Sequence, residues 1–256
     1  MGGGAAGQFG GSSGLYGCTI VNNSAAELGG GSIGITCTNS VFSGNSAVIG
    51  GGAYNSFLES CTLMNNRAFR YGGGTVGSNA VNCIIYDNLA MVEGTENYTN
   101  VPYMQACCTT PLPSAGALNI TNPPLVIEPG NPRLLPGSPC INVGYNYPWM
   151  TTATDIEGNA RIIDTTVDLG AYEYAGASSL TGAVRVAISG GYQVVAGCAL
   201  PLTATVTGKA QDLLWTFGDG ASATNVWRTA HVWSSPGTYY VSLRAANLGS
   251  LSLIHI

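Results

Sequence analysis

Few side chains in this sequence could do chemistry, because only 8% of its 256 residues are charged. Globular domains usually carry about 25% charged residues. The densest group of charges lies in one stretch: Asp155, Glu157, Arg161, Asp164, Asp168 and Glu173. Paired carboxylates could serve as the acid and base of a glycosidase, or clustered ones as calcium ligands. We favour a structural role, in which Arg161 pairs with Asp168 or Glu173 and Asp155 caps a turn.

Eight cysteines are the other reactive residues. Cys18, Cys61 and Cys83 recur once per repeat of the chain, with Ser40 at the equivalent place in one copy. Zinc sites use cysteines in close pairs, so this single spacing favours small core side chains over a metal or redox site. We therefore predict no catalytic or metal-binding residue, and calcium is the only cofactor that we weigh.

Cys140 lies outside the repeat and follows a proline. We expect it to form a disulfide with Cys108 or, as the less favoured alternative, with Cys107. Such a bond would close a loop of about thirty residues, which the chain-entropy model values at roughly 3–4 kcal/mol.

A repeat of about 22 residues must position most of these side chains. Gly triplets begin at Gly29, Gly50 and Gly72, and an asparagine follows sixteen residues after each start. With an earlier copy, the asparagine series is Asn23, Asn45, Asn66 and Asn88. Short β-like runs precede the asparagines: Thr19–Val21, Val41–Phe42, Thr62–Met64 and Ile84–Tyr86.

This period, without a helical pattern, predicts an all-β solenoid over residues 1–96, in the form of a right-handed parallel β-helix. Equivalent residues of successive coils would stack about 4.8 Å apart. The cysteines would then form an inward ladder. The asparagines would lie at a corner, where Asn tolerates left-handed backbone angles and its amide bonds to neighbouring coils. The Gly triplets would mark a second corner.

The repeats resemble those of bacterial pectin-lyase-like and polymorphic-outer-membrane-type β-helices, most closely in Asn39-Ser-Val-Phe-Ser-Gly-Asn-Ser-Ala47. Residues 97–175 lose the period and are richer in proline. An open solenoid end exposes unpaired strand edges, so we predict that this segment is a cap.

Three motifs of the predicted cap resemble the C-terminal part of the choice-of-anchor Q family. They are Ser138-Pro-Cys-Ile-Asn142, Asp155-Ile-Glu-Gly-Asn-Ala-Arg161 and Val167-Asp-Leu-Gly-Ala-Tyr-Glu173. The resemblance implies export to a bacterial cell surface, with an anchoring module after the β-helix. It implies no established reaction.

In residues 180–256, apolar and polar residues alternate in short runs. This pattern predicts an antiparallel β-sandwich, which follows a linker of small residues at 175–179. The motif Trp215-Thr-Phe-Gly-Asp-Gly220, with His231-Val-Trp233 and Pro236–Leu243, resembles a PKD domain. The resemblance implies that Trp215 and Phe217 make core contacts and that Gly218, Asp219 and Gly220 form a turn. It implies a spacer or glycan-contact module, to which Trp227 could add sugar stacking.

Composition narrows the function further. One Lys and seven scattered Arg cannot form the basic face that nucleic acids require, and no run of 18 apolar residues spans a membrane. The start of the chain lacks a signal peptide although its cysteines suggest export, so we expect a fragment that is truncated upstream. Residues 251–256 are either a final strand or translated sequencing-adaptor read-through.

We therefore favour a non-enzymatic, monomeric, secreted or surface-anchored bacterial protein that contacts glycans or other surfaces. The alternative is the C-terminal fragment of a polysaccharide lyase or glycoside hydrolase whose catalytic coils are missing. Between residues 14 and 90 the charged side chains are Glu27, Glu59, Arg67, Arg70 and Asp87. Apart from Arg67 and Arg70, they do not recur on one face of adjacent coils.

Overall fold

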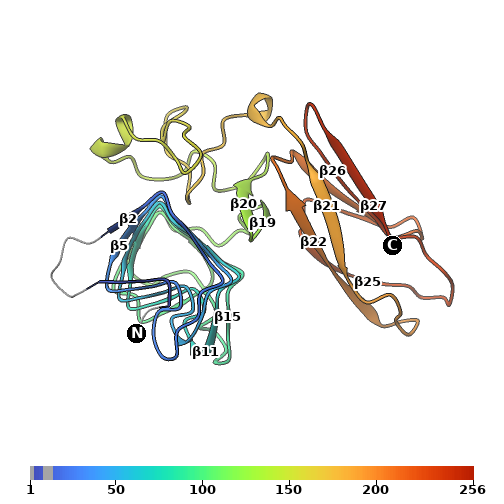
Figure 1. Cartoon of the computed structure of the whole chain (residues 1–256), viewed down its shortest axis with the longest axis horizontal. Helices are drawn as coiled ribbons and strands as arrows, with labels where there is room; N and C mark the ends of the chain where they lie inside the picture. Colours follow the sequence, from blue (N-terminus) through green and yellow to red (C-terminus); the bar gives the residue numbers. More distant parts are fainter. Residues whose placement is uncertain (1–2, 8–13) are drawn as a thin grey trace. The chain divides into compact units, whose positions relative to one another are not determined.

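The computed structural model describes residues 3–7 and 14–256, and its regular elements are β-strands apart from two short 3-10 helices at Pro148–Thr151 and Ala177–Ser179 (Figure 1). It divides into two compact units. The first holds residues 1–124 and 139–174, and the second holds residues 125–138 and 175–256. The prediction of an all-β chain, with a parallel solenoid followed by antiparallel sheets, is confirmed.

Four parallel sheets run along the solenoid of the first unit and are built from strands of successive coils (Figure 1). Sheet A contains β1 (Ala5–Ala6), β4 (Ser32–Ile33), β8 (Ala53–Tyr54), β12 (Thr75–Val76) and β16 (Tyr98–Thr99). Sheet B contains β2 (Gly14–Tyr16), β5 (Thr36–Thr38), β9 (Phe57–Glu59), β13 (Asn79–Val81) and β17 (Met104–Gln105). Sheet C contains β3 (Thr19–Val21), β6 (Val41–Ser43), β10 (Thr62–Met64), β14 (Ile84–Tyr86) and β18 (Cys108–Thr109). Sheet D contains β7 (Ser46–Ile49), β11 (Arg67–Tyr71) and β15 (Leu89–Ala90).

Residues with positive φ make the corners between the sheets, about one every five residues. Successive coils turn at Gly29, Gly34, Asn39 and Gly44, then at Gly50, Asn55, Ser60 and Asn65, then at Gly72, Gly77, Asn82 and Asp87. Glycine enters this left-handed region freely, and Asn and Asp enter it more readily than other residues with a side chain. The spacing of Gly and Asn in the sequence therefore sets the cross-section of each coil.

The Gly triplets lie where the coils approach most closely. A Cβ atom on Gly30, Gly51 or Gly73 would lie 2.3–2.4 Å from a backbone carbonyl oxygen of a neighbouring coil. No larger residue fits there without separating the coils. This close approach explains why the triplet recurs in every complete repeat.

The predicted asparagine series lies one residue beyond a corner and not at the corner itself. Positive φ belongs to the preceding residue, which is Asn65 in the third copy, and the side chain there is exposed. The next residue, Asn66, re-enters the strand direction and is fully buried. The side chains of the left-handed residues Asn22, Asn65 and Asp87 are exposed, whereas Asn45, Asn66 and Asn88 of the asparagine series are buried.

Inside the solenoid these asparagines hydrogen-bond from coil to coil. The amide nitrogen Nδ2 of Asn45 donates to Oδ1 of Asn66 at 2.9 Å, and Nδ2 of Asn66 donates to Oδ1 of Asn88 at 3.0 Å. Each Oδ1 also accepts the backbone N–H of the asparagine before it. Asn97 extends the series by one coil, at 3.2 Å from Asn88.

Residues 139–174 pack along the side of the coils, at the corner between sheets B and C. Asn39 donates to the carbonyl of Thr154 at 2.8 Å, and Asn82 both donates to and accepts from the backbone of Tyr145 at 2.8 Å. Both asparagines have positive φ, so their amides point out of the coil toward this segment. The end of the solenoid is instead extended by residues 104–120, where Ile120 pairs with Cys108.

The second unit is a sandwich of two antiparallel sheets. One contains β21 (Arg185–Gly190), β22 (Ala199–Thr207) and β25 (Arg228–Val232). The other contains β24 (Ser222–Thr224), β23 (Asp212–Thr216), β26 (Ser242–Ala246) and β27 (Leu251–His255). The core between them is built on Leu202, Val206, Leu213, Trp215 and Leu243, all buried.

A hairpin from the middle of the predicted cap belongs to this second unit. Its strands are β19 (Val126–Glu128) and β20 (Asn131–Leu134). Ile127 and Leu135 are fully buried in the sandwich core, and Asn131 donates to the carbonyls of Val206 and Gly208 at 3.0 and 2.8 Å. The segment of residues 97–175 therefore contributes to both units.

Replacing Asn66 by Ala should destabilise the solenoid more than replacing any of its solvent-exposed side chains. The change removes the acceptor of the buried Asn45 backbone N–H, one of the two acceptors of the Asn45 side-chain amide and a donor to the Phe42 carbonyl, and each buried group left unsatisfied costs about 1–3 kcal/mol. We expect a loss of about 3 kcal/mol in the free energy of unfolding of the first unit, measured by differential scanning calorimetry. Asn23→Ala, at the half-buried start of the series, is the control and should cost about 1 kcal/mol. Equal losses for the two variants would contradict the coil-to-coil role.

Candidate functional site

The charge cluster of the predicted cap is buried. Arg161 is fully buried, and its Nη2 lies 3.2 Å from Oε1 of Glu173. The guanidinium also donates to the carbonyls of Gly170 and Asp168 at 3.1 and 3.2 Å. Burial raises the pKa of the Glu173 carboxyl, and the guanidinium of Arg161 opposes that rise. Of the two partners that the sequence left open for Arg161, Glu173 makes the ion pair.

The two aspartates of the cluster accept backbone hydrogen bonds. Asp168 accepts the N–H groups of Tyr174 and Asn142 at 2.6 and 2.7 Å, and burial raises its pKa to about 6. Asp155 accepts N–H groups of the turn that follows it at 2.8 Å, an arrangement that caps a turn. Both carboxylates are at least 96% buried, so a polysaccharide cannot reach them.

No metal site is formed by these carboxylates. Within residues 3–7 and 14–256, no group of three or more His, Cys, Asp or Glu side chains is arranged to hold a metal ion. The oxygens of Asp155 and Asp168 already accept N–H groups from their own segment.

The cysteines of the repeat line the interior as small apolar side chains. Cys61 and Cys83 have no solvent exposure, and the backbone N–H of Cys61 donates to Sγ of Cys83 at 3.4 Å. Burial raises the pKa of both thiols well above the usual value, which disfavours the thiolate that metal binding and redox chemistry need. Cys18 at the start of the series is half-buried.

Cys108 and Cys140 lie next to each other in the first unit, as thiols. The largest cause that raises the pKa of the Cys108 thiol is a hydrogen bond with Cys140, followed by burial. Both side chains are fully buried, and Sγ of Cys108 lies 3.2 Å from the carbonyl of Asn122.

The motif residues of the second unit connect its two sheets. Indole Nε1 of Trp215 donates to the carbonyl of Val226 at 2.9 Å, and Nε1 of Trp233 donates to the carbonyl of Phe217 at 2.9 Å. Trp215 and Phe217 are buried, and Gly218 and Gly220 adopt φ of 77° and 93° in the turn around Asp219.

An Asp–His pair at this turn was not anticipated from the sequence. Nε2 of His231 donates to Oδ2 of Asp219 at 2.7 Å, and the imidazole stacks on Phe217 with ring centroids 4.1 Å apart. His231 also contacts Trp233 edge to face at 4.6 Å. The pair joins the β23–β24 turn of one sheet to β25 of the other.

Aromatic residues of the second unit offer one concave surface. A groove of about 700 Å³ opens between loops 191–196 and 233–239. It is lined by Tyr192, Val195, Trp233 and Tyr239, and by no charged side chain. Trp227, the candidate for sugar stacking, is half-buried with the guanidinium of Arg228 4.4 Å from its ring centroid.

Replacing Asp219 by Asn should remove an acid-dependent part of the stability of the second unit. The hydrogen bond from His231, followed by that from Ala221, holds the pKa of Asp219 below its usual value. A depressed folded-state pKa adds stability above the unfolded value of about 4 and loses it as the pH falls through the folded value.

The melting temperature of the second unit should therefore fall between about pH 5 and pH 3 in the parent chain and fall less in Asp219→Asn. Asp212→Asn, which removes a carboxylate paired with Arg244 in the same unit, is the control. An equal fall of the melting temperature in the parent and in Asp219→Asn would show that the Asp219–His231 pair adds nothing to the stability of the second unit.

The comparison with known families identifies part of the chain. Residues 183–254 match the PKD domain family, and no curated protein matches the chain. No helix among the described residues has the length and apolar character needed to cross a membrane. PKD domains are typical of extracellular or surface proteins. The chain thus joins a β-solenoid of about four turns to a PKD domain, a combination typical of extracellular bacterial proteins.

Proposed function

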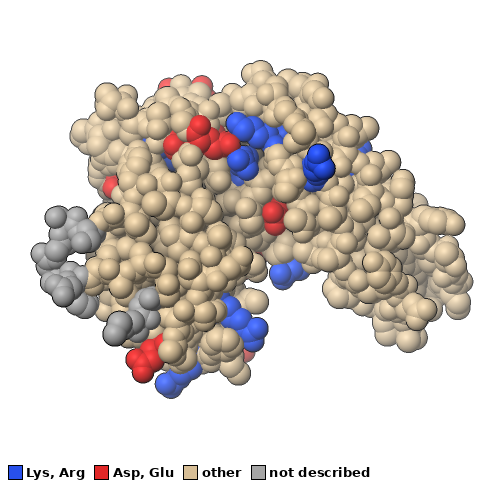
Figure 2. Space-filling view, viewed as in Figure 1, with Lys and Arg blue, Asp and Glu red and all other residues tan. Residues whose placement is uncertain are grey.

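We propose that this chain is part of a non-enzymatic protein at a bacterial cell surface, in which the β-solenoid contacts glycans and the PKD domain serves as spacer and second contact module. The observation that carries the proposal is the PKD match at residues 183–254 in a chain that also forms a β-solenoid. Charge supports the class of partner, because the faces shown in Figure 2 are mostly uncharged and the net charge is −5. Such a surface favours neutral polymers over nucleic acids.

We also assign the first unit to the choice-of-anchor Q family. The three motifs that carry the resemblance hold one another in place. Asp155 of the second motif accepts the N–H of Glu173 in the third at 2.9 Å, and Asp168 of the third accepts the N–H of Asn142 in the first at 2.7 Å. The three motifs are thus joined to one another by hydrogen bonds in the first unit, which supports treating them as one set.

The buried charge cluster supports a protein without catalytic activity. Glycosidases need two carboxylates that face the substrate from both sides of the scissile bond. Here Asp155, Asp168 and Glu173 face the interior. In the coils, Glu27, Glu59 and Asp87 come from different faces, since they lie after sheet C, at the end of sheet B and at a corner.

Binding without turnover is the test of this proposal. The purified chain should be retained by one or more insoluble polysaccharides while releasing neither reducing ends nor unsaturated uronate products from soluble xylan, glucan and pectate. Antibodies against the chain should label intact cells of the source bacterium. Product release that survives purification to homogeneity would favour the lyase or hydrolase alternative. Labelling only after cell lysis would overturn the surface location.

A protein at the cell surface should also carry the disulfide between Cys108 and Cys140. In an oxidising compartment the adjacent thiols lose two electrons and two protons to an oxidant such as glutathione disulfide. Peptide mapping without reductant should find these two cysteines linked, and Cys61 and Cys83 as thiols. Closing this loop should raise the free energy of unfolding by roughly 3–4 kcal/mol. Linkage of Cys107 in place of Cys108 would contradict the pairing.

A further inference from the structure

The outer face of sheet B carries a row of side chains that the register aligns from coil to coil. Glu59 pairs with Thr38 on one side and with Val81 on the other, and Val81 pairs with Gln105. The intervening positions, such as Leu58 and Met104, point inward and are buried, and Val81 in the middle of the outward row is buried as well. Glu59 and Gln105 therefore lie two strands apart on the same outward row, roughly 10 Å from each other.

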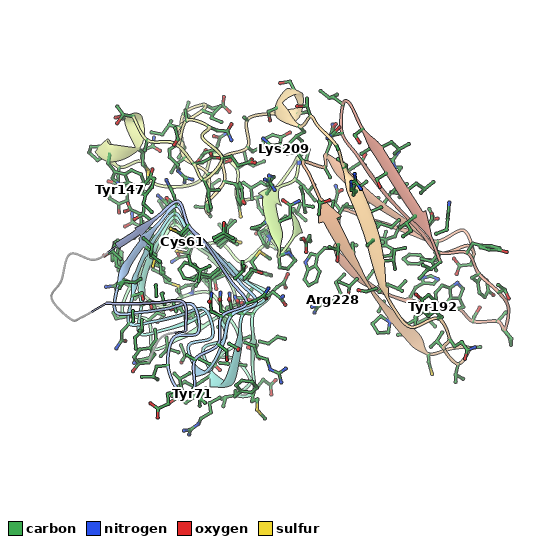
Figure 3. The ribbon with its side chains drawn as sticks, viewed as in Figure 1. Cys61, Tyr71, Tyr147, Tyr192, Lys209 and Arg228 are labelled. Carbon is green, nitrogen blue, oxygen red and sulfur yellow. The ribbon has the colours of Figure 1, made fainter. Side chains whose placement is uncertain are left out.

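Aromatic rings surround this row. Tyr145, Tyr147 and Trp149 come from the segment that packs along the solenoid, and Tyr103 comes from the loop before β17 (Tyr147 is labelled in Figure 3). Nε1 of Trp149 donates to Oε1 of Glu59 at 2.9 Å, and the rings of Tyr145 and Tyr147 meet edge to face at 5.0 Å. Burial, and then the nearby Glu59, Tyr103 and Tyr145, raise the pKa of the Tyr147 hydroxyl, so these groups lie close together.

The polar centre of this surface keeps hydrogen-bonding capacity for a ligand. Glu59 uses Oε1 for Trp149, and Oε2 accepts no hydrogen bond from the described part of the chain. Gln105 accepts the Tyr103 hydroxyl at 2.6 Å through Oε1, which fixes its amide group so that Nε2 remains a donor. A half-buried carboxylate acceptor and an amide donor on one row suit the hydroxyl groups of a sugar.

Two of the four rings are open to solvent, and those of Tyr147 and Trp149 are half-buried. Tyr103 is 42% exposed and Tyr145 45% exposed, although both are large aromatic side chains. Aromatic side chains with an apolar ring and a polar edge are well suited to amphipathic ligands. Charge selects among such ligands, because Glu59 supplies a carboxyl group whose pKa is raised by burial, whereas the nearby Arg161 is fully buried and paired with Glu173. A uronate polymer would place its carboxylates beside this carboxyl group, and Arg161 is too deeply buried to contact them.

We propose that Tyr103, Tyr145, Tyr147 and Trp149, with Glu59 and Gln105, form an aromatic platform that binds a neutral oligosaccharide along sheet B. This inference rests on the proposed glycan contact and deepens it by naming the site and the ligand class. The ligand spans more than one sugar ring, since the two polar groups stand on strands that are not neighbours.

Calorimetric titration with hexasaccharides tests the platform. The probes are hexasaccharides of glucose, xylose, mannose and N-acetylglucosamine, with hexagalacturonate as the anionic comparison. We expect at least one neutral probe to bind, and Tyr145→Ala and Tyr147→Ala each to weaken that binding about tenfold, the equivalent of losing one stacking contact with its buried area. Glu59→Gln, which keeps the size of the side chain, should weaken it less and should not create affinity for hexagalacturonate beyond that for the neutral probe.

The matched control is Tyr192→Ala, an equally conservative loss of an 82%-exposed tyrosine on the groove of the second unit (labelled in Figure 3). Binding that falls only in Tyr192→Ala would overturn the platform and leave the proposed glycan contact intact. Absence of binding by every probe to the parent chain would overturn the glycan contact itself. Tighter binding of hexagalacturonate would overturn the neutral ligand class. Unchanged melting temperatures of both units in Tyr145→Ala and Tyr147→Ala show that a loss of binding is local.

Discussion

The backbone of each coil must turn about every five residues, and each turn needs a residue that accepts positive φ. In a closed coil of about 22 residues these turns fix where the four sheets begin and end. Any L-residue other than Gly, Asn or Asp pays a larger conformational cost there. Once the corners are set, the strands of successive coils align in register. The interior asparagines and cysteines then stack on one another because they occupy equivalent positions of successive coils. The corners thus come first, and the ladders of side chains follow from them.

The same corners explain how the rest of the first unit attaches. Asn39 and Asn82 occupy corner positions, and their outward amides bond the backbone of residues 139–174. That segment has no strand of a sheet of its own, apart from the isolated bridge between Thr154 and Ala160. It is held by side-chain contacts to the coils and by the buried network of Arg161, Asp168 and Glu173. The buried charges hold together a loop-rich segment that has little apolar core.

The glycan contact that we propose lies on the outside of the coils, because the interior is filled with side chains and the charged cluster is buried. Side chains that alternate along each strand put one set of residues in the core and the other set on a face that repeats from coil to coil. A repeating face suits a repeating ligand. The placement of aromatic residues from residues 145–149 beside the outward row of sheet B joins two distant segments into one surface.

Local chemistry in the sequence determined the all-β class, the repeat, the strands of sheet C and the PKD motif, because each depends on residues within one period or one turn. Periodicity also placed the asparagine series within one residue of its corner. Tertiary structure decided the contacts made by segments outside the repeat. These are the packing of Ile127 and Leu135 in the sandwich core, the ion pair of Arg161 with Glu173, and the hydrogen bond of Trp149 with Glu59 across 90 residues of chain. Such contacts depend on which surfaces meet after the coils have stacked, and a single sequence holds no local signal for that meeting.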